Sequence, residues 1–226
     1  GLQLTGQLNL TASEVVDSDG AINLSANQIY LDFTAPTLGA YSVNGAVSQF
    51  NANIPGNIQL ISTIDLSIVD WSGAGAVLSS STGLDLQSSG RLSIPSTGLS
   101  SSSYLWLSGS DVEDGDHNLV GLNAPQLLVS SNMSSDDLTL AGSFTELDVT
   151  LGGAGANLIL NHGQEIDVLD VNGDGNALSI MDGFAAITSS GSVSLADNIS
   201  IFDNSNNGVA GGYFYLEYQG NALFGV

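Results

Sequence analysis

Residues 138–151 read LTLAGSFTELDVTL, and residues 158–170 read LILNHGQEIDVLD. In both stretches apolar residues alternate with polar ones in short runs, which is typical of strands joined by turns. The first stretch begins at Leu138 and the second at Leu158. A strand-and-turn unit that returns after a fixed interval predicts a chain that coils, with each turn of the coil lying on the previous one.

The same interval extends through most of the chain. Similar runs begin at Ile58, Leu78, Leu99, Leu119, Leu138, Leu158, Leu178, Val193 and Tyr213. The step between them is nearly constant and shortens clearly only once, between Leu178 and Val193. We therefore predict that residues 1–226 form one all-β domain, a parallel β-helix (β-solenoid) with about 20 residues per turn. An antiparallel β-sandwich also fits the composition, but it does not predict the constant step.

Two regions depart from this pattern. Residues 33–57 blur the interval and contain Pro36 and Pro55, so we expect an irregular turn of the coil or an inserted loop there. Residues 213–226 concentrate aromatic side chains in a chain that is 7% aromatic. This segment would either cap the open end of the core or join one copy of the chain to the next. Its aromatic residues are Tyr213, Phe214, Tyr215, Tyr218 and Phe224.

The charge of the chain limits its partners. There are 23 acidic residues and one basic residue, Arg91, which gives a formal net charge of −22. Nucleic acids and anionic membrane surfaces are bound through Lys and Arg, so the charge excludes both and makes cations the expected counter-species. No apolar run approaches the length of a membrane-spanning helix, so we expect no membrane insertion. Because the chain begins at Gly1 and not at a methionine, we expect any export signal to lie outside it.

Two acidic turns are candidate calcium sites. Asp170–Asp182 begins like an EF-hand loop, with Asp170, Asn172 and Asp174 at positions one, three and five. A sensor EF-hand also needs flanking helices and a glutamate at position twelve, where this chain has Met181 and strand-like flanks, so the sequence excludes it. A structural calcium ion held by the turn itself remains open, although such turns also form without an ion. The second candidate turn contributes Asp111, Glu113, Asp114 and Asp116.

An enzyme is an alternative interpretation of these acidic turns. Parallel β-helices host polysaccharide lyases and hydrolases, and glycoside hydrolysis needs a pair of carboxylates. The best pair lies in DVEDGDH, where His117 adds a proton carrier. Lyases for acidic sugars generally need Arg or Lys, however, and a strongly negative surface repels such substrates. We therefore expect no catalysis. The second histidine, His162, follows a strand and is expected to cap a turn.

Three short repeats carry a family resemblance. GQLNLTA at Gly6–Ala12 is repeated in similar form as GAINLSA at Gly20–Ala26, and GSVSLADN at Gly191–Asn198 is a weaker copy. These units resemble the haemagglutinin-type repeats of filamentous-haemagglutinin-like exoproteins, which two-partner systems secrete in Gram-negative bacteria. The resemblance implies a right-handed parallel β-helix, export from a Gram-negative cell, and a role as an adhesin shaft or surface fibre.

Together these observations predict a secreted or cell-surface β-solenoid with a structural or adhesive role. In one version the chain is a shaft segment of an adhesin that binds a glycan or a host protein. In the other it is a subunit that assembles with copies of itself into a filament through exposed strand edges. A polysaccharide-active enzyme and a phage tail-fibre-like module are the alternatives.

Overall fold

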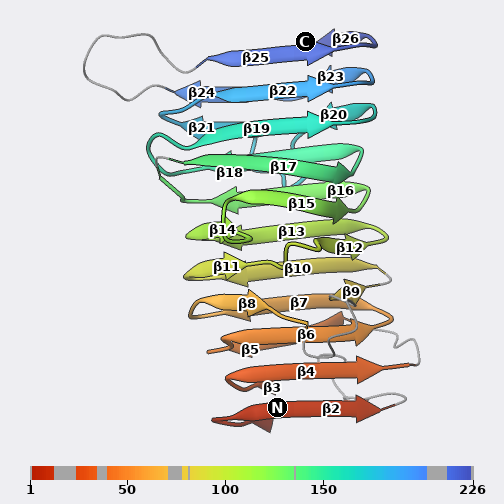
Figure 1. Cartoon of the computed structure of the whole chain (residues 1–226), viewed down its shortest axis with the longest axis vertical. Coiled ribbons are helices and arrows are strands. Elements are labelled where there is room, and N and C mark those ends of the chain that lie inside the picture. Colours follow the sequence, from red (N-terminus) through yellow and green to blue (C-terminus); the bar gives the residue numbers. More distant parts are fainter. Residues whose placement is uncertain are drawn as a thin grey trace.

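The protein is a stack of short β-strands wound into a coil (Figure 1). The computed structural model describes residues 2–12, 24–34, 40–70, 78–80, 82–134, 136–202 and 213–224. Within these ranges there is no helix, and every strand pairing is parallel, as between Leu105 and Leu127. Successive turns of the coil therefore lie on one another in the same direction, which confirms the predicted parallel β-helix.

The strands of the described residues belong to two sheets of thirteen, here named sheet A and sheet B. Sheet A contains β1 (Leu2–Gln3), β3 (Leu24–Ser25), β5 (Ala40–Gly45), β7 (Asn57–Ser62), β10 (Gly83–Ser88), β13 (Tyr104–Gly109), β16 (Gln126–Ser131), β18 (Glu146–Leu151), β20 (Ile166–Val168), β21 (Leu178–Met181), β23 (Val193–Leu195), β24 (Ile199–Phe202) and β26 (Ala222–Phe224). Sheet B contains β2 (Gln7–Ala12), β4 (Gln28–Phe33), β6 (Gln49–Ile54), β8 (Leu66–Ile68), β9 (Ser79–Ser80), β11 (Arg91–Ser93), β12 (Leu99–Ser101), β14 (Asp111–Glu113), β15 (Asn118–Asn123), β17 (Asp137–Ser143), β19 (Asn157–His162), β22 (Ala185–Ser189) and β25 (Phe214–Tyr218).

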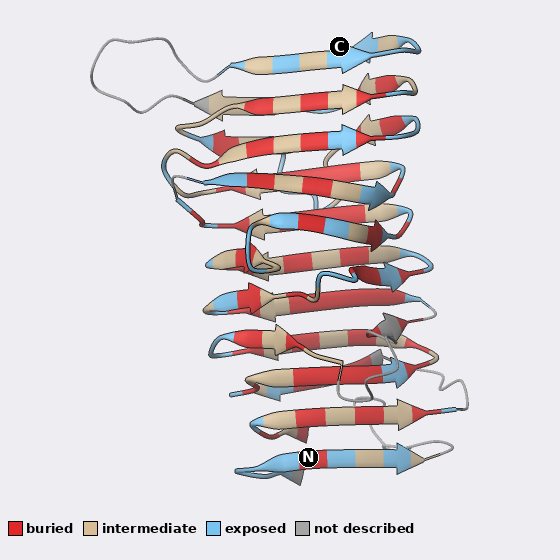
Figure 2. Ribbon diagram, in the orientation of Figure 1, coloured by how far each residue is buried: buried red, intermediate tan, exposed pale blue. Residues whose placement is uncertain are grey.

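Aliphatic ladders fill the space between the sheets. In sheet A, Leu60, Leu86, Leu107 and Val129 occupy consecutive positions of one ladder, and each is buried. Side chains alternate between the two faces of a strand, so the residues between these point outward. Figure 2 shows the resulting alternation of buried and less buried residues along the strands. One continuous apolar core therefore runs along the stack.

Each sheet divides once into two branches. In sheet B both β8 and β9 pair with β6, and β11 and β14 continue the first branch while β12 and β15 continue the second. In sheet A both β20 and β21 pair with β18. Where one sheet divides, the strands of the other sheet remain paired in sequence. Divided strands leave room for loops on the surface without interrupting the coil.

The pairing register refines the predicted period. Val129 pairs with Val149, one predicted interval further along the chain. Val149 pairs in turn with Leu178, which is a longer step because the divided strand carries a loop between β20 and β21. In the region of residues 33–57, residues 35–39 lie outside the described ranges, and β5 and β6 pair in parallel with their neighbours. Residues 20–23 of the second repeat also lie outside those ranges.

Buried serines close several corners of the coil. Each lies at the end of a strand, and its Oγ accepts a hydrogen bond from the backbone N–H two residues further on, at 3.0 to 3.5 Å. This bond satisfies a backbone donor where the chain leaves the ladder, which an apolar side chain could not do. The serines are Ser62, Ser80, Ser88, Ser101, Ser131 and Ser189.

Candidate functional site

The first acidic turn lies at the end of a branch of sheet B. Among the described strands β14 pairs with β11 alone, and Val112 in its middle is buried. Asp111 and Glu113, on either side of Val112, therefore project from the same outer face of this short strand. The chain then reverses through Gly115 and His117, whose φ angles of 111° and 58° lie in the left-handed region. The reversal brings the His117 side chain back over β14.

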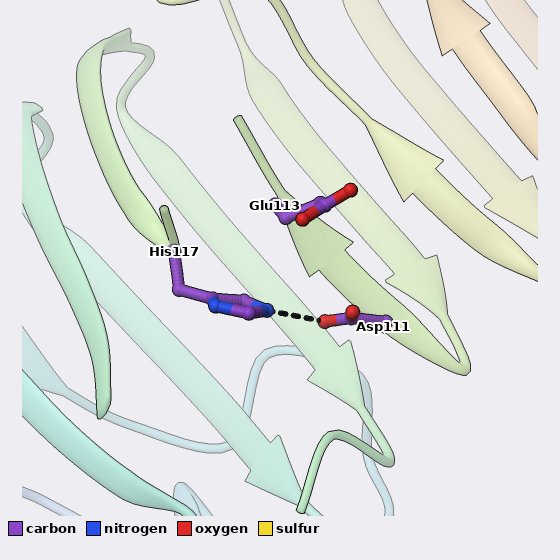
Figure 3. Close-up of side chains that lie close together, drawn as sticks. All are labelled: Asp111, Glu113 and His117. Atoms are coloured by element: carbon purple, nitrogen blue, oxygen red, sulfur yellow. Dashed lines mark hydrogen bonds and ion pairs between the residues drawn. The ribbon is translucent and has the colours of Figure 1, made fainter. Parts of the chain in front are cut away.

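The result is a compact cluster of one imidazole and two carboxylates (Figure 3). Asp111, Glu113 and His117 can each offer one ligand atom, and these atoms lie within 4.8 Å of one another. His117 Nε2 lies 2.9 Å from Asp111 Oδ1. Their side chains are 23%, 13% and 15% exposed, so solvent reaches each one only in part.

Two further charged residues surround the cluster. Asp136, just before β17, places Oδ2 3.2 Å from Nδ1 of His117. Arg91 of β11 places Nη1 3.1 Å from Glu113 Oε1 and Nε 3.8 Å from Asp111 Oδ2. The cluster therefore joins three turns of the coil through side chains.

The four acidic residues that the sequence places in this turn form two separate groups in the structure. Asp111 and Glu113 meet at the cluster, whereas Asp114 and Asp116 each accept a hydrogen bond from Asn118 N, both at 3.2 Å. Burial raises the pKa of the Asp114 carboxyl, and a hydrogen bond and the charge of Asp116 raise it further. The Asp114 and Asp116 carboxylates thus stabilise the turn.

Sequence reasoning did not assign the roles of two residues at this site. It treated His117 as a proton carrier and not as a ligand, and it did not select Asp136. A signal for Asp136 existed, because it follows His117 by nearly the interval that separates successive turns of the coil. Thr139 N donates to the His117 carbonyl at 2.9 Å, so the chain after Asp136 is indeed paired with that turn.

The second acidic turn connects β20 and β21. Both flanks are strands, in agreement with the exclusion of an EF-hand. Asp170 Oδ1 accepts hydrogen bonds from Gly173 N at 2.6 Å and from Asp174 N at 3.1 Å, and Oδ2 accepts one from Gly175 N at 2.7 Å. Asn172 Oδ1 accepts from Asp174 N, and Asn172 Nδ2 donates to Asp174 Oδ2. The structure therefore brings the three predicted residues together in one hydrogen-bonded turn.

A buried carboxylate lies beneath this turn and was not predicted. Asp148 of β18 is 2% exposed, and its Oδ2 accepts hydrogen bonds from Val171 N at 3.0 Å and Asn172 N at 3.1 Å. Burial raises the pKa of Asp148 to about 6, and the charges of Asp174 and Asp170 act in the same direction. Its place in the sequence alternation is an outward one, so only the fold of the covering turn explains its burial.

The aromatic segment forms the last turn of the coil, at the C-terminal end of the stack in Figure 1. Phe214 packs partly against the core. The other predicted aromatic residues are exposed, and the ring of Tyr213 stacks on Phe184 with centroids 4.8 Å apart. Phe224 continues the inward ladder above buried Leu195, yet it is 66% exposed, because no described strand lies above it. The exposed aromatic residues are Tyr213, Tyr215, Tyr218 and Phe224.

His162 does not cap a turn, contrary to the prediction. It is the last residue of β19, its side chain is 4% exposed, and neither ring nitrogen has a hydrogen-bond partner. The ring instead packs on Phe144, with centroids 4.7 Å apart. Burial lowers the pKa of His162.

The fold defines the class of the protein as a parallel β-helix. The chain matches no family model, and comparison with curated proteins and with solved structures found no match. Among the described residues, no helix has the length and apolar character needed to cross a membrane.

Proposed function

We propose that the protein is a structural β-solenoid of the cell surface or the extracellular space whose copies join end to end into a filament. The observation that supports this proposal best is the open C-terminal turn. There the apolar ladder continues into Phe224 and the strand edge has no described partner, while aromatic side chains surround it. The proposed role is mechanical, and the coil requires no catalysis to fulfil it.

The open edge is suited to a second copy of the chain. An edge strand presents unpaired N–H and C=O groups that readily accept another strand. At the opposite end of the stack, β2 of sheet B pairs with β4 alone among the described strands. Parallel pairing of β25 with the free edge of β2 in a second copy would continue sheet B from one copy into the next, in the way that β25 pairs with β22. It would also cover Phe214 and Leu216, which are only partly buried.

The acidic surface fits such a role through cations. A net charge of −22 keeps single copies apart at low ionic strength, because like charges repel. Divalent cations reduce this repulsion. We include in the proposal a structural calcium ion at the turn of Asp170, Asn172 and Asp174, since carboxylate and amide oxygens are the ligands that calcium prefers. Assembly would then depend on calcium as well as on protein concentration.

Sedimentation velocity and electron microscopy of the purified chain test the proposal. Wild-type protein should form rods longer than one copy as its concentration rises, and calcium should promote them. Phe224→Asp should leave monomers, since a charge on the open ladder opposes stacking. Ile64→Asp is the matched control, because Ile64 is also exposed, at 39%, but lies in the turn between β7 and β8 and not in the end turn. A wild-type chain that stays monomeric at all concentrations, with and without calcium, contradicts the filament.

Adhesion to a glycan is a second candidate function, supported by a pocket beside the last turn. The pocket has a volume of about 330 Å³ and is rich in hydrogen-bonding groups. It is lined by Asn161, His162, Gly163, Thr188, Ser189, Ser190, Glu217 and Gln219. Binding of wild-type chain to a glycan array, lost in Glu217→Gln while the protein stays folded, would favour an adhesin shaft over the filament. An array without any bound glycan would count against adhesion to sugars.

A further inference from the structure

We propose that Asp111, Glu113 and His117 bind a divalent transition metal of the zinc class, and that Asp136 orients the histidine for this purpose. A nitrogen ligand distinguishes this site from the calcium turn, because calcium takes oxygen ligands whereas imidazole suits zinc, copper, iron and nickel. The proposal concerns a different site from the assembly edge and does not depend on the filament.

Both ring nitrogens of His117 face a carboxylate oxygen. Nδ1 lies 3.2 Å from Asp136 Oδ2, and Nε2 lies 2.9 Å from Asp111 Oδ1. A neutral imidazole has one N–H, so it can donate to one of these carboxylates, and its other nitrogen then faces a second acceptor. A metal ion between Nε2 and Asp111 removes this conflict. The imidazole then donates Nδ1–H to Asp136 and binds the metal through Nε2.

This arrangement is the one in which histidines commonly bind zinc. A metal-bound histidine usually donates its second N–H to a carboxylate or carbonyl, which fixes the tautomer and strengthens the ligand. Zinc bonds of about 2.0–2.2 Å to nitrogen and oxygen place two such ligand atoms ~3.3 Å apart. His117 Nε2 and Asp111 Oδ1 are 2.9 Å apart, so the two side chains need to move only slightly away from each other to bind the ion between them. Asp136 is a positioning residue here and not a ligand.

The charges of the site match a divalent ion. Asp111, Glu113 and Asp136 carry three negative charges when ionised, and Arg91 supplies one positive charge. With a neutral imidazole the site has a net charge of −2, which a divalent ion neutralises. Arg91 approaches Oδ2 of Asp111 while His117 approaches Oδ1, so the guanidinium and the ion need not compete for the same oxygen.

The place of the site in the fold gives the ion a structural effect. Asp111 and Glu113 belong to β14, which ends its branch of sheet B, and Asp136 immediately precedes β17 in a later turn of the coil. An ion held by His117 fixes the free end of that branch to the turn after it. Zinc should therefore stabilise the folded chain as well as bind to it.

Isothermal titration calorimetry of the metal-free chain with zinc chloride tests this proposal. We expect one zinc site that persists in excess calcium. His117→Asn, which keeps a residue that tolerates a positive φ, should lower the affinity by at least ~10-fold, and Asp136→Asn by about 10-fold. Glu165→Gln, an exposed carboxylate outside the site, is the matched control and should bind zinc like the wild type. Equal zinc affinity in the wild type and His117→Asn would overturn the proposal.

Nitrogen NMR of the two imidazoles provides a test that needs no variant. Stoichiometric zinc should shift the Nε2 resonance of His117 and leave His162 unchanged, since His162 is buried at another corner. A His117 ring that keeps protons on both nitrogens in the presence of stoichiometric zinc shows an ion pair without metal and overturns the proposal. Tighter binding of calcium than of zinc at this site would overturn it as well.

Discussion

His162 lies in register with Ser189, so an imidazole occupies a strand-end position at which other turns of the coil bury a serine. Ser189 Oγ accepts a hydrogen bond from Gly191 N at 3.0 Å and donates one to Gln164 O at 2.6 Å. The imidazole makes no hydrogen bond and packs on Phe144. One corner of the core therefore contains an unsatisfied titratable group, which should make stability depend on pH.

The first prediction concerns acid sensitivity at His162. Burial lowers its pKa in the folded chain below the ordinary value of 6.5. The unfolded chain therefore binds the proton more readily, and the free energy of unfolding should fall as the pH drops below that value. His162→Phe keeps an aromatic ring against Phe144 and removes the proton site. Urea unfolding at pH 8 and at pH 5 should show a smaller loss of stability in the variant, and an unchanged loss would contradict this account.

The second prediction concerns Asp148, whose effect has the opposite sign. Its pKa is raised from 3.8 to about 6, so the folded chain binds the proton more readily than the unfolded chain. The Asp148 contribution to stability is then fully present below pH 3.8 and is lost as the pH rises through about 6. At neutral pH this difference in pKa between the folded and unfolded chain lowers the free energy of unfolding by about 3 kcal/mol.

Asp148→Asn should therefore stabilise the metal-free chain at pH 7.5. The amide oxygen can still accept from the backbone of the covering turn, and we expect a gain of about 1–3 kcal/mol. The gain should shrink at pH 4.5, where the wild-type carboxyl is largely protonated. Chemical denaturation at both pH values in EDTA measures it, and a variant less stable than the wild type at pH 7.5 would contradict the burial argument.

The third prediction concerns a close contact between two turns of the coil. Gly98 has a φ of 81°, and a Cβ added there would overlap the carbonyl oxygen of Gly121. Gly98→Ala should cost about 2–5 kcal/mol, because the left-handed backbone and the overlap both oppose the methyl group. Gly173 is a matched control, since its φ is 80° and a Cβ there meets no atom within 4 Å. Gly173→Ala should cost about 1–2 kcal/mol; equal losses would argue against the close contact.

The fourth prediction concerns calcium at the turn of Asp170. Calcium should raise the melting temperature, and EGTA should lower it, because an ion that binds only the folded chain adds about 2.7 kcal/mol at one hundred times its Kd. Asp170→Asn should abolish the difference, since it removes a charged ligand while keeping an acceptor for Gly173 N. Glu165→Gln again serves as control. Melting curves that do not change with EGTA would exclude a structural calcium ion.

The parallel coil was predictable from the sequence, because a fixed strand-and-turn interval has few other physical explanations. The detailed register was not. Two successive runs begin at Leu99 and Leu119, but these starts do not give the paired residues, because Leu99 pairs with Leu122. The register of β15 shifts between Leu119 and Leu122, where Gly121 has a φ of 70°. An irregularity of this kind follows from local backbone packing, which the alternation of side chains does not reveal.

The candidate sites were predictable to different degrees. Asp170, Asn172 and Asp174 lie in one turn of chain, so their meeting is a local matter that spacing alone indicates. Asp136 and His117 meet across turns of the coil, and Asp148 is buried by a loop that folds back over its own sheet. The interval of the coil indicates the first contact, because Asp136 follows His117 by nearly one turn. The burial of Asp148 depends on which loop covers which strand, and the periodicity of the sequence does not carry that information.

The branching of the sheets has a consequence for tensile load. Sheet B divides at β6, where sheet A is continuous, and sheet A divides at β18, where sheet B is continuous. A force that pulls the two ends of the stack apart therefore meets at least one undivided series of backbone hydrogen bonds at each of these levels. The coil can therefore carry surface loops without a mechanically weak plane at either place when it is pulled along its length.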